Sequence, residues 1–186
     1  MVSLGLDAST TCVGYAFTQD KKILDMGFID IKKETTPKDK VQKVLDFLNN
    51  ISYIDNVYDI NIEDNLSGFA GGRTSQQVII KLAKFNAILC FMLENFEYNV
   101  NSINPMTARK QVFGKARVKG IKAKDLVKMK IEEMYNTSKW CKTTKTGLWD
   151  KRNIDMYDGL VMSLFEKKAW FIPKSFVYCI KCINTN

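Results

Sequence analysis

The sequence of 186 residues contains no histidine, so a histidine general base cannot come from this chain. Its five cysteines are odd in number and irregularly spaced, which argues against a disulfide framework and favours a reduced, cytoplasmic setting. No signal peptide is expected, because Asp7 interrupts the first apolar run. The most apolar long stretch, residues 78–93, is interrupted by Lys81 and Lys84, so we also expect no membrane span.

Positive charge is concentrated in the second half of the chain. The net charge of +8 combines −3 over residues 1–104 with +11 over residues 105–186. Nine basic residues and one acid, Asp125, lie between Arg109 and Lys130. This composition is typical of a surface that follows nucleic-acid phosphates, although a solvated basic helix face has it too.

Two hydrophobic periodicities alternate along the chain, one typical of strands and one of helices. The predicted strands cover residues 2–6, 12–18, 23–31, 57–62 and 98–103. The predicted helices cover residues 38–50, 75–95, 105–112, 122–135 and 153–168. The order β-β-β-α-β-α-β, followed by helices, predicts an α/β protein with a mixed five-stranded sheet and helices on both faces, as in the ribonuclease H-like fold. We expect a single domain at residues 1–168 and a C-terminal extension at 169–186, packed on the core or on a partner.

Four acidic residues lie at the ends of apolar segments. Asp7 and Glu63 each end a predicted strand, and Asp155 and Asp158 share one face near the start of the last helix. Each acid alone is also consistent with a strand end or a helix start that faces solvent. A carboxylate at the end of a buried strand is costly unless it is paired, protonated or bound to a cation. If the three sites converge, they form an all-oxygen site for Mg²⁺ or Mn²⁺.

The order of these motifs resembles that of the RuvC-type Holliday junction resolvases. Residues 4–7, Leu-Gly-Leu-Asp, with Gly14 and Tyr15 on the next strand, are similar to the first motif of that family. Residues 60–63 are similar to its second motif, and residues 81–88 to its long helix. Residues 105–124 are similar to a segment with two spaced lysines, and residues 155–160 to the closing D-x-x-D motif. The composition, rich in lysine, asparagine and isoleucine, suggests a phage or viral member.

The resemblance implies a divalent-metal endonuclease that works as a homodimer and nicks two opposing strands of a four-way DNA junction. The implied catalytic and metal-binding residues, holding two Mg²⁺ or Mn²⁺ ions, are Asp7, Glu63, Asp155 and Asp158. Lys110 and Lys124 best match the two lysines that hold phosphates near the site. The other residues that we expect to contact DNA are Phe69, Arg73, Arg109, Lys115, Arg117, Lys119 and Lys122.

Three features depart from the family pattern. Leu66 stands where bacterial members carry an aromatic residue, and the nearest aromatic is Phe69, which either contacts DNA bases or anchors its loop. An insertion at residues 137–152 interleaves tryptophans with basic residues, which suits nucleic-acid contact or a local hydrophobic cluster. The extension at 169–186 contains a lone Cys179-x-x-Cys182 pair, too little for a zinc site.

The sequence leaves three alternative functions to be weighed. A broader nuclease for branched DNA, RNA or RNA–DNA hybrids shares the same acids. In ribonuclease H enzymes, however, the first helix supplies a glutamate, and residues 38–50 contain none. An actin-like sugar kinase or ATPase needs a second lobe and a glycine-rich loop after its first aspartate, whereas residues 8–11 contain no glycine. A DNA-binding module without catalytic activity is opposed by the presence of all four acids.

The predicted helix at residues 75–95 is the expected dimer surface. Its apolar residues cover more of the circumference than one buried stripe requires. We expect one face to cover the sheet, and Phe85, Leu89 or Met92 to contact a second copy.

Overall fold

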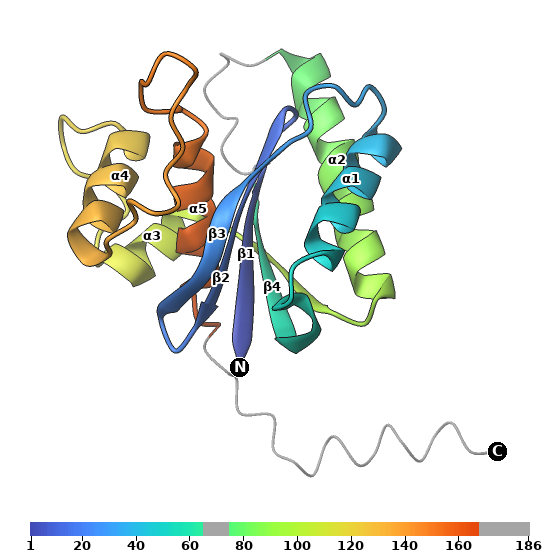
Figure 1. Cartoon of the computed structure of the whole chain (residues 1–186), viewed down its shortest axis with the longest axis horizontal. Helices are drawn as coiled ribbons and strands as arrows, with labels where there is room; N and C mark the ends of the chain where they lie inside the picture. The colour runs from blue at the N-terminus through green and yellow to red at the C-terminus, as the bar shows by residue number, and fades with distance from the viewer. Residues whose placement is uncertain (65–74, 168–186) are drawn as a thin grey trace, which may run out of the picture.

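The computed structural model of the protein describes residues 1–64 and 75–167 (Figure 1). The strands in these residues are β1 (Val2–Ala8), β2 (Cys12–Gln19), β3 (Lys22–Asp30), β4 (Val57–Glu63) and β5 (Asn99–Ile103). The helices are α1 (Pro37–Asn49), the 3₁₀ helix η1 (Ile54–Asn56), α2 (Gln76–Asn95), α3 (Pro105–Phe113), α4 (Ala123–Met134) and α5 (Asn153–Ser163). The predicted mixed sheet with helices is confirmed.

The five strands form one sheet in the order β3-β2-β1-β4-β5. The pairs β1–β2 and β2–β3 are antiparallel, and the pairs β1–β4 and β4–β5 are parallel. Helix α1 lies in the connection to β4, because a parallel pair needs a crossover rather than a tight turn. Strands β1 and β4 therefore lie side by side in the middle of the sheet and end at the same edge.

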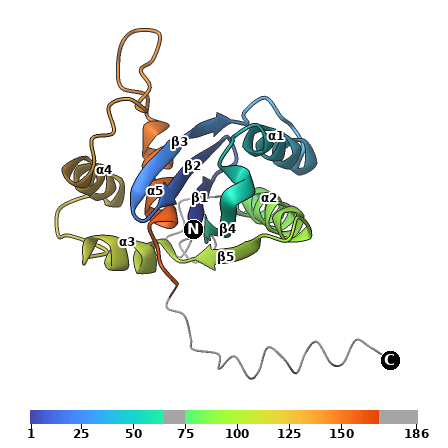
Figure 2. The ribbon, with the colours of Figure 1, turned by 60° about the horizontal axis from the view of Figure 1, so that its bottom comes forward.

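Helices cover both faces of the sheet (Figures 1 and 2). Helices α1 and α2 pack on one face over a core that includes Leu4, Phe17 and Ile60. Helices α3, α4 and α5 lie on the other face, where α5 contacts β1 and β2 and carries the buried Tyr157 and Leu160. The protein is therefore a three-layer sandwich with two separate apolar cores.

Helix α5 packs directly on the sheet because three glycines remove side chains from the contact. A Cβ atom built on Gly5 of β1 would lie 2.1 Å from the carbonyl oxygen of Gly159. A Cβ atom on Gly14 of β2 would lie 1.8 Å from the carbonyl oxygen of Asp155. No side chain larger than hydrogen fits between these backbones, so the glycines set the distance from α5 to the sheet.

Polar side chains of the sheet satisfy the carboxyl end of α5. The buried Asn61 amide donates hydrogen bonds to the carbonyl oxygens of Met162 and Phe165, at 3.0 and 3.1 Å. The Thr18 hydroxyl donates to the carbonyl oxygen of Ser163 at 3.1 Å. These donors replace the partners that the last turn of a helix lacks, and they hold α5 along its axis.

Helix α2 differs from the prediction in its orientation. Phe85 and Leu89 are 1% and 0% exposed and pack in the core of this chain, so the prediction that they contact a second copy is wrong. Met92 is half-buried against the same core. The exposed face instead carries Ile80 and Phe91, at 52% and 60% exposure. By length and composition alone α2 could cross a membrane, a property that core helices of soluble proteins share.

Some sequence predictions fall outside the described residues or differ at the element ends. Phe69, Arg73 and the extension at 169–186 lie outside them. Helix α5 ends at Ser163, five residues before its predicted end, where the side chains of Asn61 and Thr18 bind its last carbonyl groups. Strand β1 continues to Ala8, so Asp7 lies within the strand rather than beyond it.

The contact at Gly5 gives a stability prediction. We expect Gly5→Ala to lower the free energy of unfolding by about 3 kcal/mol or more, because the added methyl group collides with backbone that cannot rotate away. Urea denaturation measures this change. Ser3→Ala on the same strand is the matched control, because it adds no atoms, and it should cost much less. Equal stabilities for wild type and Gly5→Ala would contradict the close packing of α5.

Candidate active site

Three carboxylates from three elements meet at the carboxyl edge of the sheet. Asp7 comes from β1, Glu63 is the last residue of β4, and Asp158 lies in the second turn of α5. One carboxylate oxygen from each residue lies within 4.8 Å of the other two. The parallel register that pairs Leu6 with Ile62 places Asp7 level with Glu63. Packing of α5 on β1 and β2 then brings Asp158 against both.

Burial and mutual repulsion favour the protonated form of this triad. Asp7 and Asp158 are 8% and 2% exposed. Burial raises the pKa of Asp7 well above its ordinary value, and the charges of Glu63 and Asp158 raise it further. Burial and Asp158 raise the pKa of Glu63 to about 7. The triad is therefore a site where negative charge is crowded and a cation is favoured.

Arg109 of α3 supplies positive charge from within the protein. Its guanidinium Nη2 donates to Asp158 Oδ1 at 2.9 Å, and the side chains are only 11% and 3% exposed. Burial raises the pKa of Asp158, but the charge of Arg109 opposes that rise and also lowers the pKa of Glu63. Arg109 therefore stabilises the ionised triad without reaching outward to solvent.

Asp155 lies at the margin of the cluster rather than within the triad. Its Oδ1 accepts a hydrogen bond from Lys124 Nζ of α4 at 3.3 Å, and its side chain is 18% exposed. Its charge still raises the pKa of Asp7, so it contributes to the same electrostatic field. Burial first, and then Asp155, raise the pKa of the nearby Cys12 thiol to about 12, which keeps that thiol protonated.

The triad suits a divalent cation by its chemistry. All its ligand atoms are carboxylate oxygens, which Mg²⁺ and Mn²⁺ prefer. The buried Glu63 Oε2 has no hydrogen-bond partner among the described residues, an uncommon condition for a charged atom. A cation bound by Asp7, Glu63 and Asp158 would satisfy this oxygen and offset the repulsion among the three groups.

The predicted DNA-binding residues divide into two groups. Arg109 and Lys124 point into the acidic cluster, where they pair with Asp158 and Asp155. The others described by the structure are exposed on and between α3 and α4: Lys110, Lys115, Arg117, Lys119 and Lys122. Lys110, matched by sequence to a lysine near the site, is exposed on α3, and its neighbour Arg109 forms the ion pair with Asp158.

The inward position of Arg109 has a signal in the sequence. Pro105, Ala108, Arg109 and Val112 follow the i, i+3, i+4, i+7 spacing of one helix face, and Ala108 is fully buried. Lys110 lies about 100° further around the helix, on the exposed side. Helical periodicity therefore separates the two basic residues, whereas similarity to a motif does not.

The insertion at residues 137–152 is anchored by aromatic packing. Trp140 and Trp149 pack against the core that contains the α5 residues, and the ring centroid of Trp149 lies 6.4 Å from that of Tyr157. Thr137 and Tyr157 share a buried hydrogen bond of 2.7 Å. Both tryptophans thus form a local hydrophobic cluster, one of the two predicted alternatives, while the exposed Lys145 and Lys151 remain available to solvent.

Compared by sequence, the chain matches no protein-family model and no curated protein. Compared by structure, it is similar to Thermus thermophilus RuvC, with a TM-score of 0.59 and 12% identity over 88% of this chain and 92% of that one. It is similar to T. thermophilus RuvC in complex with Holliday junction substrate, with a TM-score of 0.58 and 14% identity over 88% and 90% of the two chains. For the yeast mitochondrial Holliday junction resolvase Ydc2 the TM-score is 0.55, with 15% identity over 87% and 75%. The predicted RuvC-type fold is confirmed.

The raised pKa values predict how stability depends on pH. Glu63 has a pKa of about 7 in the folded protein and an ordinary value of 4.5, so the folded state holds its proton more tightly than the unfolded state. The resulting stabilisation is complete below pH 4.5 and is lost as the pH rises through 7. We therefore expect the metal-free protein to become easier to denature with urea between pH 5 and 8.

Two variants and the addition of metal test whether Glu63 causes this pH dependence of stability. Glu63→Gln should flatten the dependence, whereas Glu133→Gln, at an exposed position, should leave it unchanged. Adding Mg²⁺ or Mn²⁺ at pH 8 should restore the stability of the wild type and have less effect on Glu63→Gln. Stability of the metal-free protein that rises steadily from pH 5 to 8 would contradict the assignment.

Proposed function

We propose that this protein is a divalent-metal-dependent endonuclease that resolves four-way DNA junctions by paired, symmetric nicks. The observation that carries the proposal is the triad of the buried Asp7 and Asp158 and the half-buried Glu63 at the carboxyl edge of a RuvC-type sheet. One similar structure is a RuvC protein in complex with Holliday junction substrate, which supports branched DNA as the substrate. The exposed basic surface of α3 and α4 supports a polyanionic substrate independently.

The residues of the site would have different roles in the reaction. Asp7, Glu63 and Asp158 would hold the cations, with Asp155 completing the set at its margin. Two ions held by these carboxylates would supply an activated water and would stabilise the leaving oxygen of a phosphodiester. Arg109 favours the ionised, ligand-competent form of Asp158 and fixes its orientation through the 2.9 Å bond. The low exposure of Asp7 and Asp158 limits the water that reaches the reacting phosphate.

Lys124 is the basic residue best placed to change partners on binding. Its side chain is 63% exposed while its ammonium contacts Asp155, so it reaches both the acids and solvent. Burial lowers the pKa of Lys124, but the charges of Asp155 and Asp158 outweigh that effect and raise it, so the group stays cationic. A phosphate at the site would accept from Lys124 as Asp155 turns toward a cation.

Cleavage of a panel of labelled substrates tests the proposal. In Mg²⁺ or Mn²⁺ we expect four-way junctions to be cut faster than forks, duplex DNA and RNA–DNA hybrids. Asp7→Asn, Glu63→Gln and Asp158→Asn should each reduce cleavage by at least about 100-fold while junction binding survives, because ligand charge is lost and the basic surface is intact. Asp46→Asn, at an exposed position further along α1, is the control and should cleave normally. Equal cutting of hybrids and junctions would favour a broader nuclease.

Paired nicking requires two sites related by two-fold symmetry, and α2 offers the surface for a second copy. Its exposed face presents Ile80, Ala87 and Phe91 in one stripe, together with Lys84 and Glu94. In an antiparallel pair centred near residue 89, Ala87 would face Phe91 and Lys84 would face Glu94 of the other copy. The contact of the small Ala87 with the large Phe91, and that of Lys84 with Glu94, then each occur twice, once on each side of the two-fold axis. An isologous interface requires this repetition.

Sedimentation at micromolar concentration tests this dimer. We expect the wild type to sediment as a dimer and Phe91→Asp to sediment as a monomer, because a buried charge opposes association. Phe96→Asp is the matched control, since Phe96 is 53% exposed and lies at the end of α2, off the proposed stripe. A wild type that is monomeric both alone and on a junction would contradict paired nicking by a homodimer.

A further inference from the structure

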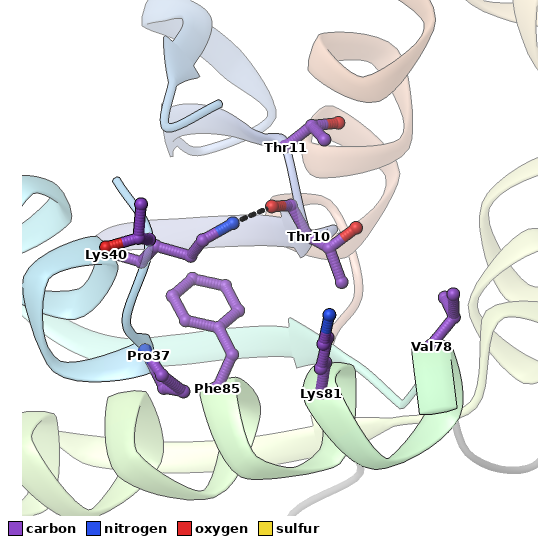
Figure 3. Close-up of a pocket in the computed structure, with 8 residues that line it drawn as sticks. Thr10, Thr11, Pro37, Lys40, Val78, Lys81 and Phe85 are labelled. Carbon is purple, nitrogen blue, oxygen red and sulfur yellow. Dashed lines mark hydrogen bonds between the residues drawn. The ribbon is translucent and has the colours of Figure 1, made fainter. Parts of the chain in front are cut away.

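A cavity of about 330 Å³ lies on the α1–α2 face of the sheet, next to the β1–β2 connection that follows Asp7. It is bounded by the β1–β2 connection, the segment before α1, the first turns of α1 and the amino-terminal half of α2 (Figure 3). The residues that line it are Thr10, Thr11, Thr35, Pro37, Lys40, Val78, Lys81 and Phe85. None of them belongs to the predicted catalytic or DNA-binding set.

Two lysines give this cavity an uncompensated positive charge. Lys40 extends from α1, and its ammonium donates to the carbonyl oxygen of Thr10 (Figure 3). An ammonium has three donors, so two remain available. Lys81 extends from α2 toward the same loop, and within residues 1–64 and 75–167 neither lysine forms an ion pair. The cavity holds no carboxylate among its lining residues.

The remaining walls fit the other parts of a nucleotide chain. The hydroxyl groups of Thr10, Thr11 and Thr35 can donate hydrogen bonds to anionic oxygens. Pro37, Val78 and Phe85 provide apolar surface next to the lysines, which suits a sugar rather than a fully hydrated ion.

One edge of the cavity, at Thr10, is close to Asp7 along the chain. Thr10 follows Asp7 by three residues, so their Cα atoms are at most about 11 Å apart. Lys81 lies on α2, which follows the strand that carries Glu63. A single nucleic-acid strand bound at the triad would therefore bring a phosphate to the cavity within a few nucleotides.

We propose that this cavity binds a backbone phosphate of the DNA strand that crosses the active site, with Lys40 and Lys81 as its cationic contacts. The inference rests on the proposed nuclease function and adds the path of the strand. Arg109 and Lys124 approach the triad from α3 and α4 on one face of the sheet, and Lys40 and Lys81 lie on the other face. The strand would thus be held on both sides of the cleaved bond.

Salt-dependent binding of a four-way junction in Ca²⁺ or EDTA tests this contact. We expect Lys81→Met to weaken binding about tenfold and to reduce the slope of log K against log salt by about 1. The double variant Lys40→Met/Lys81→Met should lose more in both measures. Lys22→Met is the control for lost charge, because Lys22 is exposed at the start of β3, at the opposite end of the sheet. The slope of log K against log salt for this variant should match that of the wild type.

Uncharged methylphosphonates placed singly along the junction strand give a second measurement. At the position that contacts the cavity, the substitution should weaken binding by the wild type and have little further effect on the Lys81→Met variant. Lys40 also anchors the β1–β2 loop, whereas Lys81 is exposed, so the Lys81 variants remain informative if Lys40→Met fails to fold.

The possible results distinguish a failure of the nuclease function from a failure of the cavity assignment. A wild type that does not bind branched DNA overturns both the nuclease function and the cavity assignment. A wild type with a steep salt dependence, together with a Lys81→Met variant of unchanged affinity and slope, overturns the cavity assignment alone. In that case the Lys124→Met variant should still lose affinity. Binding of inorganic phosphate or a mononucleotide with the junction affinity unaffected by Lys81→Met would assign the cavity to a small-molecule ligand and also overturn the strand path.

Discussion

Helix α5 touches strands β1 and β2 backbone to backbone, and the geometry of the acidic cluster depends on that contact. Gly5 and Gly14 on the strands and Gly159 on the helix leave no room for a Cβ atom without a shift of backbone. Asp155 and Asp158 lie one turn or less from this contact, so the glycines determine how closely they approach Asp7. Asn61 fixes the same helix at its other end. The sheet thus controls both the depth and the axial position of the carboxylates.

Bringing three carboxylates within 4.8 Å of one another opposes folding, as the raised pKa values of Asp7 and Glu63 show. The protein offsets this cost only in part, through Arg109 on Asp158 and Lys124 on Asp155. If fixed side chains neutralised all the negative charge of the carboxylates, no electrostatic attraction for a cation would remain. Partial compensation would keep the folded state accessible without metal and would still favour binding of a divalent ion.

Most of the fold follows from local sequence patterns, because the apolar side chains that repeat with the strand or helix period are the ones buried between the layers. The acids Asp7 and Glu63 were also predictable, since each ends an apolar strand and the parallel pairing of β1 and β4 aligns them. Orientation around a helix was harder to predict. Motif similarity did not show that Arg109 pairs with Asp158, and composition alone did not show that Phe85 faces inward. The cavity beside Lys81 depends on three segments that are distant in sequence, so no local pattern reveals it.

The unusual composition of α2 follows from the several surfaces that it supplies at once. Its inner side carries Leu82, Phe85 and Leu89 into the core, where they cover the sheet. Its amino-terminal half adds Lys81 to the cavity at the β1–β2 connection, and its outer side exposes Ile80 and Phe91. A helix that only covered the sheet would need one apolar stripe and a polar outer face. The apolar outer face is thus unexplained by the fold of one chain, and the proposed second copy would account for it. Such a copy would place two acidic triads, each with its own cavity, about one symmetry axis, which is the arrangement that a two-fold symmetric junction requires.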